Sequence, residues 1–574
     1  MAKQFNSSAQ NLVYHLEVGV GPAILKASLY ILFMGLMALL YVATQYHGFN
    51  SPKAMDQAQL ARSFSESGRL HTRVIRPGDI YYLEQHGKLT QQADMPLMVG
   101  QPDLVNAPVY PVLLGTVFKV FGTQFPQATG TRYVPEQWVI IPLNLLFCFF
   151  SGLFVYLLGR QLFSPRVAFT SVTIFLLTGQ LWAGAISGTE ISFALLCYSF
   201  AIWCLVSILN ASVNDDAKGL RLFLPALLGA GALLLLFLTR YGSMVLLPGY
   251  IMALFLGLKK KAWIPVGMVI LVVLIGMSPW ILRNISVSGS PFGLAPHYAV
   301  QGESQDYFMR SYGDVNNENA TVIRGLIVRV LGATQKAFSF TDMHLGSGIA
   351  LCLFVVTYFY SFQRTPVKIL RWLILVSYLC LILAAGIFGH NQFEVAHVMF
   401  PLIILYGTAF FYLLLDRMQI TVQIVSLGII SFFVFLQALP LLVTLMPPKP
   451  SSYPPYLARE ISLITSPFEP TELVSSDMPW ATAWYGGQLS LYLPLTVDQF
   501  FEMNDRLQPV KGLYLTMLTR DLPYQSNLVR GNYISWKPIM DLNPLPRGWP
   551  LRVGFPISGG NSVILSDQNR WQNK

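Results

Sequence analysis

Apolar stretches of about 20 residues, separated by short polar connections, repeat along most of this 574-residue chain. A helix rises about 1.5 Å per residue, so each stretch is long enough to cross the roughly 30 Å hydrocarbon core of a bilayer. The pattern therefore predicts a polytopic α-helical membrane protein. Eleven spans are expected, near residues 23–44, 136–158, 167–186, 190–210, 222–239, 243–258, 263–282, 346–362, 369–389, 396–415 and 419–445.

One apolar run, from Leu222 to Leu258, is too long for a single crossing and is interrupted only at "TRYGS", Thr239–Ser243. An arginine at the centre of a bilayer costs about 2.5–3.5 kcal/mol. Two spans joined by a tight turn would keep Arg240 at the interface, so we expect the chain to turn there.

The short connections set the orientation. "GRQLFSPR", "KKK" at 259–261, "QRTPVK" and "DRM" at 416–418 all fall on one side of the predicted bundle, together with Lys3 and Lys26. Cytoplasmic loops carry the excess of lysine and arginine, so the N-terminus is expected in the cytoplasm and the C-terminus outside.

Three polar segments are then external: a first loop (45–135), a second loop (283–345) and the tail (446–574). The tail opens with the proline-rich "MPPKPSSYPPY" and then alternates short apolar runs with helical stretches. This order predicts a transmembrane domain over residues 1–445, followed by a small external α/β domain over residues 446–574.

Composition excludes several classes of protein. Hydrophobic residues make up 53% of the chain and charged residues only 11%, against about 25% charged in soluble domains. The net charge of +10 is spread over the loops rather than gathered on one face, so no nucleic-acid partner is expected. All five cysteines lie in apolar runs, which predicts neither disulfides nor a zinc site.

A carboxylate follows the first span directly, in "SPKAMDQAQLARSF". Helical spacing would place Met55, Leu60 and Phe64 on one face and Asp56 on another. The stretch is therefore predicted to be an amphipathic helix along the outer surface. Asp56 is a candidate catalytic acid there, and a residue that only solvates the helix is the alternative. "QPDLVNAPVYPVLLG", 101–115, predicts a second juxtamembrane helix.

Further ionisable residues occupy the outer ends of later spans. Glu190, in "AISGTEISFALL", is either a site residue or a neighbour of a helix cap. The cationic candidates are Arg240, Arg283, His390 and His397. Such groups at one level form an anion site suited to phosphate, although a single boundary arginine is usually an interfacial anchor. Acids and cations on one face suit transfer from an anionic lipid.

Seven motifs, in this order over residues 23–445, resemble the GT-C superfamily of polyprenyl-phosphate-sugar-dependent glycosyltransferases, in particular the aminoarabinose transferases of lipid A and the protein O-mannosyltransferases. They are "MDQAQLARSF", "NAPVYPVLLGTVFKVFG", "FVYLLGRQLFSPRVAF", "SGTEISFALL", "FLTRYGSMVLLP", "SPWILRNISVSGSPFG" and "VAHVMFPLIILYG". The resemblance implies a GT-C-like helix arrangement, with Asp56 as general base and Glu190 orienting a substrate. It implies that Arg240 and Arg283 face the lipid phosphate. His390, His397 and Tyr110 are further candidates for binding the substrate or its phosphate.

Two departures from the family pattern stand out. Gln57 follows Asp56 where the family often has two acids, which argues against a two-carboxylate metal site there; a divalent metal is the one cofactor left open. Ala396-His397 stands where many members have Arg-Tyr before a proline.

The resemblance favours a glycosyltransferase of the bacterial inner membrane that acts on the external, periplasmic face. Its donor would be a polyprenyl-phosphate sugar, and its acceptor a lipid, a glycan or a protein. A GT-C-like structural or assembly subunit without activity is the alternative. A transporter fits less well, because the acids lie at outer ends rather than at the midplane and no repeat is evident.

Overall fold

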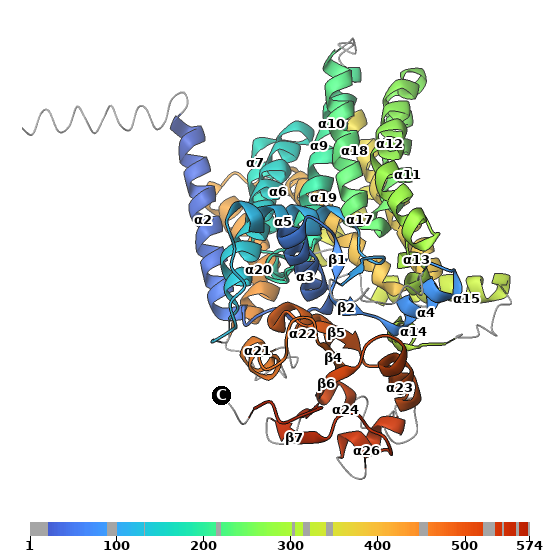
Figure 1. Ribbon diagram of the computed structural model, residues 1–574. Helices are drawn as coiled ribbons and strands as arrows, with labels where there is room; N and C mark the ends of the chain where they lie inside the picture. Colours follow the sequence, from blue (N-terminus) through green and yellow to red (C-terminus); the bar gives the residue numbers. More distant parts are fainter. Residues whose placement is uncertain are drawn as a thin grey trace, which may run out of the picture.

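The computed structural model describes residues 21–88, 100–130, 132–213, 220–300, 305–313, 322–339, 348–446, 457–520, 534–541, 545–557 and 562–571. Long apolar helices form a bundle with a sheet at one end (Figure 1). The bundle is built from α2 (Gly21–Gln45), η1 (Glu136–Ile140), α6 (Ile141–Leu162), α7 (Pro165–Leu176), α8 (Gly179–Ile186), α9 (Ile191–Val213), α10 (Leu220–Thr239), η2 (Tyr241–Leu246), α11 (Leu247–Leu258), η3 (Lys259–Ala262), α12 (Trp263–Ser288), α17 (Gly348–Val356), η5 (Thr357–Phe359), α18 (Thr365–Phe388), η6 (His390–Met399), α19 (Phe400–Arg417) and α20 (Gln423–Leu445).

The prediction of a polytopic helical membrane protein is confirmed, but the count of eleven spans is not reached. Within the described residues, eight helices are long and apolar enough to cross a membrane, or nine if α7 and α8, bent by 52°, form one span. The stretch Tyr241–Ser288 counts once although it turns at Lys259, where φ is +53°. The helix Gly348–Phe359 is too short to cross by itself.

The interruption expected at Thr239–Ser243 is confirmed. Helix α10 ends at Thr239, Arg240 has extended backbone, and the chain resumes as the 3₁₀ helix η2. Arg240 therefore lies between two spans, at the end of the bundle that carries the sheet. The α11–α12 connection with its three lysines lies at the opposite end (Figure 1).

Short helices from the polar loops gather at the sheet end: α3 (Pro52–Ser67), α4 (Pro77–Gln85), α5 (Val109–Val120), α13 (Ala295–Val300), α14 (Gln305–Arg310) and α15 (Val322–Ser339). Helix α3 packs between α5 and the tail helix α22 (Pro479–Gly486). Asp56, Gln57 and Gln59 are consequently buried. The prediction that this helix lies along the outer surface was wrong, because α5 and α22 pack against it and the first loop encloses its polar side chains.

The tail contributes five strands to a six-stranded sheet with the strand order β2-β5-β4-β6-β8-β7. Strands β2 (Val74–Ile75), β5 (Leu489–Tyr492), β4 (Leu473–Ser476) and β6 (Val510–Leu515) are parallel; β8 (Ser562–Ser566) and β7 (Val553–Ile557) complete the sheet antiparallel. Its helices are α21 (Ala458–Thr465), α22, α23 (Val497–Arg506), α24 (Met517–Arg520), η7 (Ile534–Trp536) and α26 (Lys537–Met540).

Strand β2 belongs to the first polar loop, so a domain boundary at residue 446 leaves out one strand of this sheet. A separate two-stranded ladder joins β1 (His71–Thr72) to β3 (Gln101–Pro102) within the same loop. The predicted proline-rich linker at 447–456 lies outside the described residues.

A buried acid ties the tail to the bundle. Glu136, at the start of η1, is fully buried. Tyr46 donates a hydrogen bond to its Oε2 at 2.6 Å, and Trp484 of α22 donates to its Oε1 at 2.7 Å. The tail is thus docked through the same helix that packs on α3.

Candidate active site

Helix α3 places Asp56 in its second turn. The helix begins with Pro52, whose missing N–H would be unpaired there in any case, and ends at Gly68 in the left-handed conformation, φ +70°. Asp56 is 8% exposed. A carboxylate buried to this degree must be paired or hydrogen-bonded, and the surrounding loop supplies the partners.

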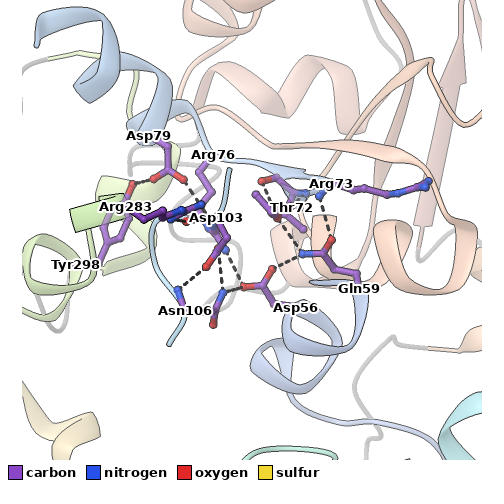
Figure 2. Close-up of polar contacts among 11 residues, drawn as sticks. Asp56, Gln59, Thr72, Arg73, Arg76, Asp79, Asp103, Asn106, Arg283 and Tyr298 are labelled. Carbon is purple, nitrogen blue, oxygen red and sulfur yellow. Dashed lines mark hydrogen bonds and ion pairs between the residues drawn. The ribbon is translucent and has the colours of Figure 1, made fainter. Parts of the chain in front are cut away.

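Three side chains hold Asp56 (Figure 2). Arg76 NH2 forms an ion pair with Oδ2 at 2.8 Å, and Asn106 Nδ2 donates to the same oxygen at 2.9 Å. Gln59 Nε2 donates to Oδ1 at 3.2 Å. Both carboxylate oxygens of Asp56 therefore accept hydrogen bonds, and Oδ2 also pairs with the charge of Arg76.

Two more aspartates complete the group around Arg76, which is 5% exposed. Asp79 Oδ2 lies 3.4 Å from Arg76 NH1, and its Oδ1 accepts from the Tyr298 hydroxyl. Asp103 accepts from the backbone N–H of Asn106 at 2.8 Å and from its side chain at 3.2 Å. We call Asp56, Asp79, Asp103 and Arg76 the aspartate cluster.

Burial dominates the electrostatics of this cluster. It raises the pKa of Asp103 to about 6, with a further contribution from the nearby charge of Asp56. Burial also raises the pKa of Asp79, against the opposing effect of Arg76. For Arg76, burial acts to lower the pKa, but the three aspartates outweigh it and the net pKa is raised. The guanidinium therefore stays charged in its buried position.

The aspartate cluster does not fit a divalent metal. Such an ion takes about six oxygen ligands at 2.0–2.6 Å. Here the carboxylate oxygens already accept from nitrogen and hydroxyl donors, and the Arg76 guanidinium bridges Asp56 and Asp79. In the described part of the chain, no three histidine, cysteine, aspartate or glutamate side chains are grouped to hold a metal ion.

A second charged group surrounds Glu190, which is fully buried just before α9. Lys53 of α3 pairs with its Oε1, and Arg240 NH1 lies 3.3 Å from the same oxygen. Burial acts to raise the pKa of Glu190, but Lys53 and Arg240 outweigh it and the net pKa is lowered. Glu190 Oε2 has no hydrogen-bond partner among the described residues.

Arg240 is neutralised on its other side as well. Its NH2 lies 2.8 Å from Glu394 Oε2 and donates to the carbonyl of Asn391 at 3.0 Å. His397 Nδ1 lies 2.9 Å from the carbonyl of Glu394. The predicted phosphate ligand Arg240 is thus held between two carboxylates. His390 is the first residue of η6, and its side chain is not among the parts of the chain that the structure describes.

Arg283 lies apart from Arg240. Its NH1 donates to the carbonyl of Asp103 at 2.6 Å and to Asn284 Oδ1 at 2.9 Å, and its guanidinium stacks over Trp280 at 4.6 Å. Arg283 also lines a cavity of about 570 Å³. The walls of this cavity include the apolar side chains of Phe64, Val112 and Trp280 and the polar side chains of Arg69, His71 and Arg283.

The residues that line the cavity include two arginines and no acid. Burial lowers the pKa of His71, and the charges of Arg69 and Arg283 lower it further. His71 Nδ1 is buried and lacks a hydrogen-bond partner among the described residues. The two arginine charges, which add to the effect of burial on His71, also favour an anion in the same place. Apolar walls with a cationic end suit an amphiphilic anion.

Tyr110, also predicted to bind phosphate, lies in the packed interior. It is fully buried, and its hydroxyl is 3.0 Å from the Gly188 carbonyl and 3.2 Å from Asn144 Oδ1. Gly188 has φ +76°, and a Cβ there would lie 2.3 Å from the Phe49 ring. Tyr110 thus holds the turn that leads into Glu190.

Tyr241 connects the two charged groups. It follows Arg240 directly, and its hydroxyl contacts the carbonyl of Asn106 at 3.5 Å. Trp280 Nε1 donates to the same hydroxyl at 2.5 Å. The structure therefore brings Asp56, Glu190, Arg240 and Arg283 to one end of the bundle, but in separate clusters rather than in one phosphate site.

Sequence reasoning missed the partners of these residues. Arg76, Asn106, Lys53 and Glu394 make the closest contacts, yet none was a candidate. Arg76 stands in "VIRPG" without a motif of its own. The one available signal was the number of acids in the first loop, which required a buried cation to balance them.

No family model matches the chain, and no curated protein matches it in sequence. Solved structures do match. The archaeal oligosaccharyltransferase AglB from Archaeoglobus fulgidus, in complex with an inhibitory peptide and a dolichol-phosphate, superposes with a TM-score of 0.55 at 11% identity, over 96% of this chain and 75% of that one. ArnT from Cupriavidus metallidurans, bound to undecaprenyl phosphate, superposes with a TM-score of 0.54 at 11% identity, over 96% of this chain and 99% of that one.

The chain has the GT-C fold. The resemblance inferred from the seven motifs is confirmed at the level of the fold, because the match to ArnT spans nearly the full length of both chains, sheet included. At 11% identity, the similarity establishes the arrangement of the helices but not the chemistry of individual side chains. The reaction must therefore be argued from the residues of this chain.

Proposed function

We propose that this protein is a membrane glycosyltransferase that transfers a sugar from a polyprenyl-phosphate donor to an acceptor on the external face of the bacterial inner membrane. One observation carries the proposal: the cationic, apolar-walled cavity adjoins the Asp56 network. Arg283 lines the cavity and bonds the Asp103 carbonyl, while Asn106 bridges Asp103 and Asp56. AglB and ArnT, solved with lipid phosphates, support the general kind of substrate.

In this reaction the donor phosphate lies against Arg283 and Arg69, with the prenyl chain along the apolar wall. Asp56 accepts the proton of an acceptor hydroxyl as the acceptor oxygen bonds to the anomeric carbon of the sugar. The bond from that carbon to the phosphate oxygen breaks, and the lipid phosphate leaves with the electron pair. The cavity arginines stabilise the charge that grows on it. The acceptor is a lipid, a glycan or a protein.

The test separates binding from chemistry. Purified protein in nanodiscs is titrated with undecaprenyl phosphate and then incubated with a panel of polyprenyl-phosphate sugars, with water as acceptor. We expect Arg283→Ala to bind undecaprenyl phosphate at least about tenfold more weakly, because hydrogen bonds to charged groups are worth about 1.5–3 kcal/mol. Asp56→Asn should bind normally and lose hydrolysis.

Arg160→Ala is the matched control, because Arg160 lies in the last turn of α6, at the opposite end of the bundle. Equal lipid binding by Arg283→Ala and Arg160→Ala would remove the phosphate site from this cavity. Wild-type hydrolysis by Asp56→Asn would remove the proposed base. Binding without hydrolysis of any donor by the wild type would favour the alternative, a GT-C-like subunit without activity.

A further inference from the structure

A buried cation occupies the centre of the aspartate cluster. Arg76 bridges Asp56 and Asp79 with its two terminal nitrogens, at 2.8 and 3.4 Å, and the charge of Asp103 acts on it as well. A planar guanidinium can engage two carboxylates at once, which a lysine ammonium does with poorer geometry. Three acids and one arginine thus form a compact buried group.

The backbone of Arg76 is fixed by the tail. Arg76 follows β2 directly, and β2 pairs with β5 in parallel, Val74 with Ser490 and Ile75 with Leu491. The following residues enter α4, where Gly78 lies so close to the second loop that a Cβ would be 2.3 Å from the Phe308 carbonyl oxygen. Arg76 is therefore held from both sides by segments distant in sequence.

We propose that Arg76 is a positioning residue for the transfer reaction: a tethered cation that takes the place of a divalent metal at Asp56 and aims its carboxylate at the acceptor. This inference rests on the proposed function, because it assigns a role at the same site. The hydrogen bonds of the cluster support this inference, because the carboxylate oxygens of Asp56 and Asp79 already accept from arginine, amide or hydroxyl donors.

The first measurement needs no enzymatic activity. Mn²⁺ binding to purified protein is followed by electron paramagnetic resonance for wild type, Arg76→Ala and Arg76→Gln. Removal of the guanidinium leaves three carboxylates facing one another, so we expect both variants to bind Mn²⁺ at least tenfold more tightly than wild type. Arg73→Lys is the matched control: Arg73 lies in the same loop and contacts the Gly487 carbonyl and Glu66, not the cluster. Equal Mn²⁺ affinity in wild type and both Arg76 variants would overturn the inference.

The second measurement uses donor hydrolysis and lipid binding. We expect wild-type hydrolysis to persist in EDTA, and Arg76→Lys to lower kcat at least tenfold while undecaprenyl phosphate affinity stays within twofold. Arg76→Ala should regain part of its rate with methylguanidinium. Loss of wild-type activity in EDTA, or a tenfold weaker lipid affinity in Arg76→Lys, would overturn the inference. If the wild type hydrolyses no donor, the proposed function fails, and the Mn²⁺ titration still decides whether Arg76 is the resident cation.

Discussion

The contact between Trp484 and Glu136 offers a direct test of how the tail supports the site. Trp484 is fully buried on α22, and its indole N–H donates to Glu136 Oε1 at 2.7 Å. The same helix packs on α3, which carries Asp56. Changing Trp484 to Phe removes this donor and keeps an aromatic ring in place. Of these two donors, only the Tyr46 hydroxyl then remains bonded to the Glu136 carboxylate.

The expected cost follows from the surroundings. Leaving a buried acceptor without its donor costs about 1–3 kcal/mol. The phenyl ring keeps its aromatic neighbours, with ring centroids at 6.3 Å for Phe118, 6.0 Å for Phe125 and 5.3 Å for Tyr133. The smaller ring adds a packing loss of about 1 kcal/mol, typical of partial truncation in a core. We therefore expect Trp484→Phe to destabilise the protein by about 2–4 kcal/mol.

A thiol-reactive dye measures unfolding in detergent, because Cys148, Cys197 and Cys204 are buried in the bundle and become reactive when it opens. Trp484→Phe should lower the Tm by several degrees and reduce donor hydrolysis. Trp571→Phe, in the tail and packed against Phe468, is the control and should change neither. If the two variants have the same Tm as wild type, the hydrogen bond to Glu136 does not dock the tail.

Two further predictions concern the interior of the site. Asp103 has its pKa raised from 3.8 to about 6, so its ionisation between pH 4 and 7 costs the folded state about 3 kcal/mol, and stability falls as pH rises through this window. Asp103→Asn should lack that fall; parallel Tm curves for the two proteins from pH 4.5 to 7.5 would contradict the assignment. Gly188→Ala forces a left-handed residue and a Cβ 2.3 Å from the Phe49 ring, which together cost about 2–4 kcal/mol. Its Tm should fall, and adding Phe49→Leu should restore part of the loss; a wild-type Tm in Gly188→Ala alone would refute the close contact.

The features that could be predicted from the sequence are those set by nearby residues. Hydropathy over about 20 residues located the long helices, and one arginine in an apolar run located the break at Arg240. Strand β2 could not be predicted, because two residues show no alternation and their partner β5 lies more than 400 positions away. The burial of α3 escaped prediction for the same reason: the helix that covers it belongs to the tail.

The ion pairs of Arg240 could not be predicted from the sequence either, because their partners lie far apart in it. Arg240 was expected to face a phosphate, yet Glu190 and Glu394 enclose it in the structure. A sequence shows how many acids and bases an end of the bundle contains, but only the fold shows which of them neutralise each other. Buried pairs form because an unpaired charge is costly there, and that pairing decides which charges remain for a ligand.

The pairing leaves a simple division among the arginines of this site. Arg76 and Arg240 each face two carboxylates, so acids within the protein neutralise their charges. Arg283 instead bonds two neutral oxygens, those of the Asp103 carbonyl and the Asn284 amide, and lines the cavity with Arg69. Its charge remains to act on whatever the cavity binds; on His71 it adds to the effects of burial and of Arg69, which lower the pKa of that residue. An anion recruited there would lie beside the turn from Asp103 to Asn106 that holds Asp56, which is why the cavity and the carboxylate are best understood as two parts of one site.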